Sequence, residues 1–128
     1  MSNNDTLTVE SGVTVDTSAA EPVELEGHTF STSSTTITNN GTIIGTTKGI
    51  EADQSTDFSI DNSGTVSVTD NLNRPGSALS LQQSSGTVSI VNSGTLESER
   101  ADTIKLHPST GTVTINNSGN ITSSKDRT

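Results

Sequence analysis

One short motif recurs along the chain, and this repetition constrains the fold more than any other feature. The motif reads Ile, any residue, Asn, Asn or Ser, Gly, Thr or Asn, and an aliphatic residue. Its four clear copies are Ile37–Ile43, Ile60–Val66, Ile90–Leu96 and Ile115–Ile121, and a degraded copy is Glu10–Val13. The motif glycines, at positions 12, 41, 64, 94 and 119, are separated by 29, 23, 30 and 25 residues. Self-similarity at this spacing predicts a repeat protein, in which each unit covers the apolar face of the next.

Each period contains three short segments with strand periodicity. An alternating stretch leads into the motif, as in Thr87-Val88-Ser89-Ile90. About ten residues after most of the glycines comes an aliphatic pair at i, i+2. These pairs are Val23/Leu25, Ile50/Ala52, Leu79/Leu81 and Ile104/Leu106. Alternation of apolar residues with Ser and Thr predicts strands, and no segment of useful length has the 3.6-residue period of a helix.

The repeat therefore predicts an all-β, single-domain parallel β-solenoid over residues 1–128, with polar tails at residues 1–6 and 123–128. It predicts about 4–5 coils of 23–30 residues, each with three short strands. Insertions are expected in loops, mainly between the motif glycine and the aliphatic pair, as in Thr69–Gly76. The predicted core consists of Ile37, Ile60, Ile90, Ile115, Val23, Leu25, Ile50, Leu79, Leu81, Ile104 and Leu106, with Phe30 closing its first coil.

Composition agrees with a narrow core. Hydrophobic residues make up 26% of the chain and aromatic residues 2%, well below an ordinary globular domain. The missing bulk is replaced by Ser, Thr, Asn and Gly, whereas disordered chains are enriched in Lys, Glu and Pro. A thin β-structure needs only a few aliphatic side chains per turn, so this composition is sufficient for it.

Charge and residue types exclude several partners. The formal net charge is −9 with only six Lys and Arg, so we expect no nucleic-acid partner. The absence of cysteine excludes disulfides and thiolate metal sites. No stretch approaches the length of an apolar membrane span, and Met1–Thr6 do not resemble a signal peptide.

The motif asparagines predict a ladder of stacked side chains at one turn. Amides at equivalent positions of successive coils hydrogen-bond along the axis, each donating to the next. The glycine two positions later is expected to supply a backbone angle closed to other residues. The predicted turn ladder consists of Asn39, Asn62, Asn92 and Asn117 with Gly41, Gly64, Gly94 and Gly119. Glycosylation or metal ligation by these asparagines is the weaker reading, because acceptor patterns arise by chance in a chain rich in Asn, Ser and Thr.

With the repeat laid out, the chain resembles passenger segments of bacterial autotransporters and related large surface adhesins. The resemblance rests on the motif, as in Ile90-Val91-Asn92-Ser93-Gly94-Thr95-Leu96, and covers about residues 35–121, with residues 7–25 more weakly. It implies a right-handed parallel β-helix of the pectin-lyase-like kind, together with export and a role in adhesion or display. It carries over no receptor-binding or catalytic residue.

We predict no catalytic, cofactor or metal site. The best acidic cluster for a carbohydrate-active enzyme is Glu51, Asp53, Asp57 and Asp61, but the chain has no Trp or Tyr to stack on sugars. Asp53, Asp57 and Asp61, or Glu97, Glu99 and Asp102, are the candidates for weak calcium binding. His28 and His107 are read as exposed loop residues. An outward ladder for ice binding would comprise Ser34/Thr36, Asp57/Ser59, Thr87/Ser89 and Thr112/Thr114.

The sequence thus favours a non-enzymatic structural or adhesive module of a bacterial surface or secreted protein. The alternatives are a β-helix enzyme resembling polysaccharide lyases and an ice-binding solenoid. Incomplete first and last coils have two readings. Copies stack head to tail into fibres, because an open solenoid end offers unpaired strand groups, or the chain is a piece of a longer β-helix. Other cell-surface proteins or glycans are the remaining expected partners.

Overall fold

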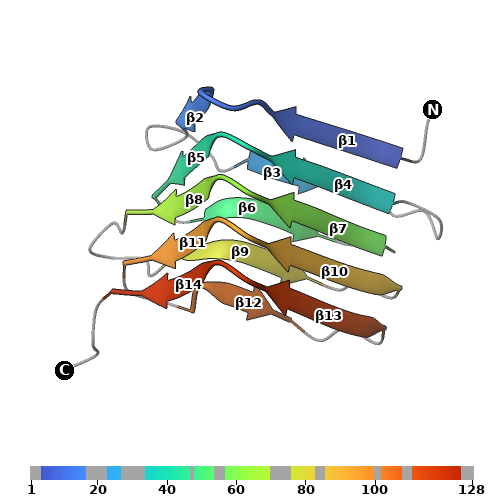
Figure 1. Ribbon diagram of the computed structural model, residues 1–128. Coiled ribbons are helices and arrows are strands. Elements are labelled where there is room, and N and C mark those ends of the chain that lie inside the picture. Colours follow the sequence, from blue (N-terminus) through green and yellow to red (C-terminus); the bar gives the residue numbers. More distant parts are fainter. Residues whose placement is uncertain are drawn as a thin grey trace.

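The chain folds into five stacked coils of β-structure (Figure 1). The computed structural model describes residues 4–16, 23–26, 34–46, 48–53, 57–69, 76–82, 86–99, 102–107 and 111–124, and these residues form strands and turns without a helix. The first coil comprises β1 (Asn4–Val9), β2 (Thr14–Asp16) and β3 (Val23–Glu26). The second comprises β4 (Ser34–Asn39), β5 (Thr42–Gly45) and β6 (Lys48–Asp53), and the third β7 (Asp57–Asn62), β8 (Thr65–Val68) and β9 (Ser77–Gln82). The fourth comprises β10 (Thr87–Asn92), β11 (Thr95–Ser98) and β12 (Ile104–Leu106), and the last β13 (Thr112–Asn117) and β14 (Asn120–Ser123).

Equivalent strands of successive coils form three parallel sheets. The sheets have the orders β1-β4-β7-β10-β13, β2-β5-β8-β11-β14 and β3-β6-β9-β12. Ile37 pairs with Ile60, and Ile60 with Ile90, so the repeat positions stay in register. The crossovers are right-handed (Figure 1), as almost all parallel connections are. The structure thereby confirms the predicted parallel β-solenoid with three strands per coil.

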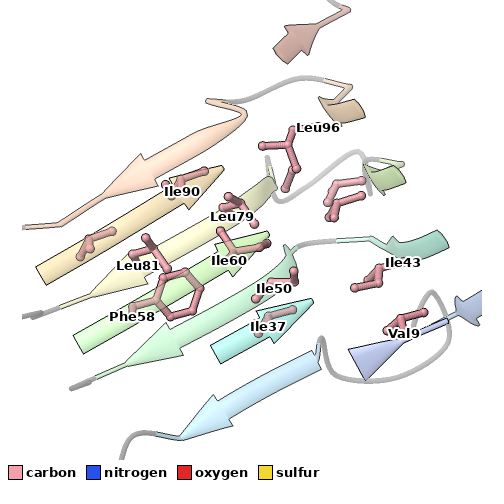
Figure 2. Close-up of a cluster of buried hydrophobic side chains, with 14 residues drawn as sticks. Val9, Ile37, Ile43, Ile50, Phe58, Ile60, Leu79, Leu81, Ile90 and Leu96 are labelled. Carbon is pink, nitrogen blue, oxygen red and sulfur yellow. The ribbon is translucent and has the colours of Figure 1, made fainter. Parts of the chain in front are cut away.

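The core is a narrow column of aliphatic side chains between the three sheets. Ile37 and Ile60 are completely buried and Ile90 is 1% exposed. Figure 2 shows them beside side chains of the opposite sheet, among them Ile50, Leu79 and Leu81. Phe58 is the largest of the fully buried side chains. Because each coil adds only a few such residues, the core needs no more apolar residues than this sequence contains.

The prediction of a buried core is wrong for two residues of the C-terminal end. Ile115 is 46% exposed and Leu106 is 40% exposed, although both face the column that is buried in earlier coils. No described strand lies beyond β13 or β12, so these side chains are covered on one side only. Ile104 is half-buried and packs against the core. Strand β3 contains Val23 and Leu25 at the expected pairing positions, but their side chains, and Phe30 as a whole, lie outside the described residues.

Coil length varies in the loops. Residues 46–47 connect β5 to β6, whereas residues 69–76 connect β8 to β9. The sheet register is unaffected, because Ile50 still pairs with Leu79. Insertions therefore fall after the motif turn, as predicted.

A matched pair of substitutions tests the core. Ile90→Asp puts an unpaired charge into the closed column and should lower the free energy of unfolding by about 4 kcal/mol or more, a large part of the stability of a small domain. Ile115→Asp occupies the equivalent, half-exposed position and should cost far less. Urea unfolding followed by circular dichroism measures both. Equal losses would contradict the inward orientation of Ile90.

Candidate functional site

The acidic residues proposed for an enzyme site lie on two different sheets. Glu51 is on β6 in the third sheet, 8% exposed, and forms an ion pair with Lys48. Asp57 and Asp61 are exposed on β7 in the first sheet. The side chain of Asp53 lies outside the described residues. Glu51 is therefore not on the same sheet as Asp57 and Asp61.

The second acidic group lies on β11 and in the connection from β11 to β12. Glu97 accepts a hydrogen bond from Oγ of Ser67 at 2.7 Å, while Glu99 and Asp102 are exposed. Among the described residues no three His, Cys, Asp or Glu side chains are close enough to hold a metal ion.

Of the two histidines, His107 is half-buried after β12, and its backbone N–H donates to the carbonyl of Leu81 at 2.9 Å. His28 lies outside the described residues.

The outer face of the first sheet carries a regular array of small polar side chains. Its central column contains a hydroxyl in each coil, namely Thr6, Thr36, Ser59, Ser89 and Thr114. The neighbouring column contains Ser34, Asp57, Thr87 and Thr112, as predicted for an outward ladder. The carboxylate of Asp57 interrupts it and accepts the backbone N–H of Thr87 at 2.7 Å. A shallow, open depression of about 210 Å³ lies here, lined by Ser34, Thr36, Asp57, Phe58, Ser59, Thr87 and Ser89.

The asparagine ladder (Asn39, Asn62, Asn92 and Asn117) is formed as predicted. Nδ2 of Asn39 donates to Oδ1 of Asn62 at 2.7 Å, and Nδ2 of Asn62 donates to Oδ1 of Asn92 at 2.7 Å. Nδ2 of Asn92 donates to Oδ1 of Asn117, again at 2.7 Å. The first three asparagines are completely buried. Their amides satisfy one another in the low dielectric of the interior, where an unpaired polar group is costly.

The ladder has a direction, because every amide donates toward the C-terminal coil. The same Nδ2 also reaches a carbonyl of the following coil, as Asn62 does to Thr95 at 3.2 Å. At the N-terminal end, Oδ1 of Asn39 accepts the backbone N–H of Gly41 at 3.2 Å. That oxygen therefore needs no donor from the first coil.

The motif glycines are required for a close approach between coils, and the backbone-angle explanation is wrong. Gly41, Gly64, Gly94 and Gly119 all have φ outside the left-handed region; among the described residues only Gly12 has positive φ, at 81°. A Cβ atom at any of the four would come within 3.0 Å of a carbonyl oxygen of the preceding coil. For Gly64 that oxygen belongs to Gly41, and the same oxygen accepts the N–H of Thr65 at 2.9 Å. A side chain would push the two coils apart at this bond.

The turn of the first coil has neither the ladder asparagine nor the motif glycine at the equivalent positions. Val9 pairs with Asn39, so an aliphatic residue occupies the ladder position. The carbonyl of Val13 accepts the N–H of Thr42 at 2.9 Å, as the motif glycines do in later coils. The alignment of Gly12 with these glycines is therefore wrong: the turn between β1 and β2 is longer, and Val13 occupies the glycine position.

The C-terminal face (Leu106, Val113, Ile115 and Asn117, with the edges of β12, β13 and β14) leaves part of the aliphatic column uncovered. Its three aliphatic residues are between 37% and 46% exposed. Nδ2 of Asn117 donates to the carbonyl of Gly119 at 3.1 Å. The sequence signal for this surface is the pattern Val113-x-Ile115-x-Asn117, whose copy in the fourth coil, Val88-x-Ile90-x-Asn92, is buried by its neighbour.

Comparison of the chain with protein-family models, curated proteins and solved structures yields no match in any of the three. The resemblance to autotransporter passengers therefore remains a prediction. No helix long and apolar enough to cross a membrane occurs among the described residues.

Replacing Asn62 by Asp tests the ladder, and the same change at its last residue, Asn117, tests the direction of the ladder. In Asn62→Asp the carboxylate still accepts from Asn39 but faces Oδ1 of Asn92 without a proton to donate. Burial without a cation raises the pKa of the new carboxyl above its unfolded value of about 3.9. The protonated form is then favoured by folding, so the loss of stability relative to wild type should be small below about pH 4 and grow to about 3 kcal/mol as the pH rises through the folded pKa.

Urea unfolding of the variant and the wild type at each pH measures this difference. Asn117→Asp is the matched control, because the last amide accepts from Asn92 and has no following asparagine in the ladder. The stability of this control should differ little from that of the wild type across the same pH range. A pH-independent loss in Asn62→Asp would contradict the ladder, and a large pH-dependent loss in Asn117→Asp would contradict its assigned direction.

Proposed function

We propose that this chain is a non-enzymatic structural β-solenoid, a rigid spacer or adhesive stalk module of a bacterial surface or secreted protein. One observation carries the proposal: three parallel sheets and a side-chain ladder run through successive coils in one register. Hydrogen bonds between coils lie along the solenoid axis, so tension along that axis loads many of them at once. A stalk needs this mechanical property.

The exterior supports the same function. The described outer positions carry mainly Ser, Thr and Asn, and the acidic residues are dispersed over different sheets. Small polar side chains keep a β-surface hydrated, and the net charge of −9 opposes non-specific association. Glycans or other surface proteins are the proposed partners of the variable loops, because loops tolerate change without altering the sheets.

Single-molecule force spectroscopy tests the stalk. Since the chain has no cysteine, Thr8→Cys on β1 and Asn116→Cys on β13 provide two exposed handles in the same outer column. Pulling between them loads the sheets along the axis, and we expect cooperative rupture in discrete events. The same handles in the Asn62→Asp background should rupture at lower force at neutral pH. Gradual extension at low force without discrete events would contradict the proposed function.

An enzyme assay provides an independent check. We expect no cleavage when the chain is incubated with acidic polysaccharides and the products are separated by size. Cleavage that disappears in Asp57→Asn or Asp61→Asn would replace the structural function with a carbohydrate-active one.

The hydroxyl column Thr6, Thr36, Ser59, Ser89 and Thr114 favours ice binding as the second candidate. A repeated hydroxyl on a parallel sheet presents oxygens at the inter-strand spacing of about 4.8 Å. If this face binds ice, the chain should show thermal hysteresis, and Ser59→Lys at the centre of the column should abolish it. Val91→Lys, also outward on β10 but in the next column, is the matched control and should reduce hysteresis less. Absence of hysteresis in the wild type would exclude this candidate.

A further inference from the structure

The interfaces between coils inside the molecule show what one coil requires of the next. The following coil places an asparagine where it accepts the ladder bond, and a glycine two positions later where it meets the preceding carbonyl. Aliphatic residues two and four positions before the asparagine close the column, as Val88 and Ile90 do before Asn92. A coil that fits therefore reads aliphatic-x-aliphatic-x-Asn-x-Gly over its first strand and the turn after it.

The C-terminal face presents the surface that such a coil would cover. Ile115 is 46% exposed, whereas its counterpart Ile90 is 1% exposed beneath the fifth coil. Nδ2 of Asn92 donates to Oδ1 of Asn117 at 2.7 Å and also reaches the carbonyls of Asn120 at 3.1 Å and Gly94 at 3.4 Å. Among the described residues, the Asn117 amide has one acceptor, the carbonyl of Gly119 at 3.1 Å. Its second N–H would donate to Oδ1 of the ladder asparagine in an added coil.

The first coil does not meet the same requirements. Val9 stands at the asparagine position and offers no oxygen to a preceding amide. Val13 stands at the glycine position, where the other coils leave no room for Cβ beside the preceding carbonyl. If a second copy stacked head to tail, Val9 would cover the Asn117 amide and Val13 would press on the carbonyl of Gly119. An N–H would be buried without a partner and the coils would be forced apart.

We propose that the C-terminal face docks a coil of a partner β-solenoid chain whose first strand and following turn read aliphatic-x-aliphatic-x-Asn-x-Gly. The first coil does not fit the C-terminal face, so copies of this chain do not join head to tail into fibres. This assignment replaces the fibre hypothesis suggested by the sequence. It rests on the geometry of the coil interface and is independent of the stalk function.

The first experiment supplies the coil covalently. A second copy of residues 95–119 is inserted directly after Gly119, so that a further β13-like strand follows in register. We expect the melting temperature to rise by about 5 °C or more, and the amides of Val113 and Ile115 to gain hydrogen-exchange protection. The matched control carries Asn117→Val and Gly119→Val in the inserted copy only, which gives it the two valines of the first coil. The control should show neither gain, and an equal gain in both insertions would overturn the proposal.

The second experiment supplies the coil on another polypeptide. The probe is the full chain with Val9→Asn and Val13→Gly, which make its first coil acceptable, and Ile115→Lys, which blocks its own C-terminal face. Its matched control carries Ile115→Lys alone. Sedimentation equilibrium is run at an ionic strength that screens the charge of −9. Wild type mixed with the probe should form a one-to-one dimer, while wild type with the control, and wild type alone, should remain at the 13.2 kDa monomer mass.

Two results would overturn the proposal. Concentration-dependent growth of wild type alone would show that Val9 and Val13 do not stop stacking. Failure of the probe to pair, when the inserted coil does stabilise the chain, would show that the face accepts only a covalently continuous coil and not a partner chain. Neither result bears on the force measurement, so failure of this inference and failure of the stalk function are distinguishable.

Discussion

The register between successive coils is the constraint on which the rest of the molecule depends. In a β-strand a shift of one residue turns every side chain to the opposite face, which here would move the aliphatic column outward and hydroxyls inward. The asparagine ladder penalises such a shift, because Asn39, Asn62 and Asn92 are fully buried and satisfied only when their amides meet. The glycine that follows adds a steric condition at the adjacent turn. Loops of different lengths are tolerated because neither condition involves them.

Because the core column is thin, the stability of each coil depends mainly on its contacts with the adjacent coils. Each coil contacts the coils on either side, so nearest-neighbour terms dominate, as in other repeat proteins. Residues paired across a coil interface, such as Asn62 and Asn92, are 30 positions apart in sequence. Folding therefore requires closure of a loop of moderate length for each coil. The polar ladder adds specificity to a core that a few aliphatic residues per coil would leave weakly determined.

The sequence predicted the features that a repeated local pattern encodes. Alternation around Ile60 and Ile90 gave the strands, and the constant spacing from Ile to Asn gave the ladder. Three features depend on distances between coils, which no pattern supplies. The glycines serve a close approach instead of a backbone angle, Ile115 is exposed because it has a neighbour on one side only, and Glu51 is buried through the packing around β6. Val13 was misaligned because the glycine next to it, Gly12, falls at nearly the expected period.

The common direction of the ladder bonds has an electrostatic consequence. Peptide-like amides carry a dipole of about 3.5 D, and dipoles arranged head to tail add instead of cancelling. The side-chain amides of Asn39, Asn62 and Asn92 each donate toward the following coil, so the row is polarised along the solenoid axis. Hydrogen bonds in such a chain strengthen one another. The amide of Asn117 therefore carries a more positive N–H than an isolated asparagine, and the ladder has its positive end at the C-terminal face of a protein whose net charge is strongly negative.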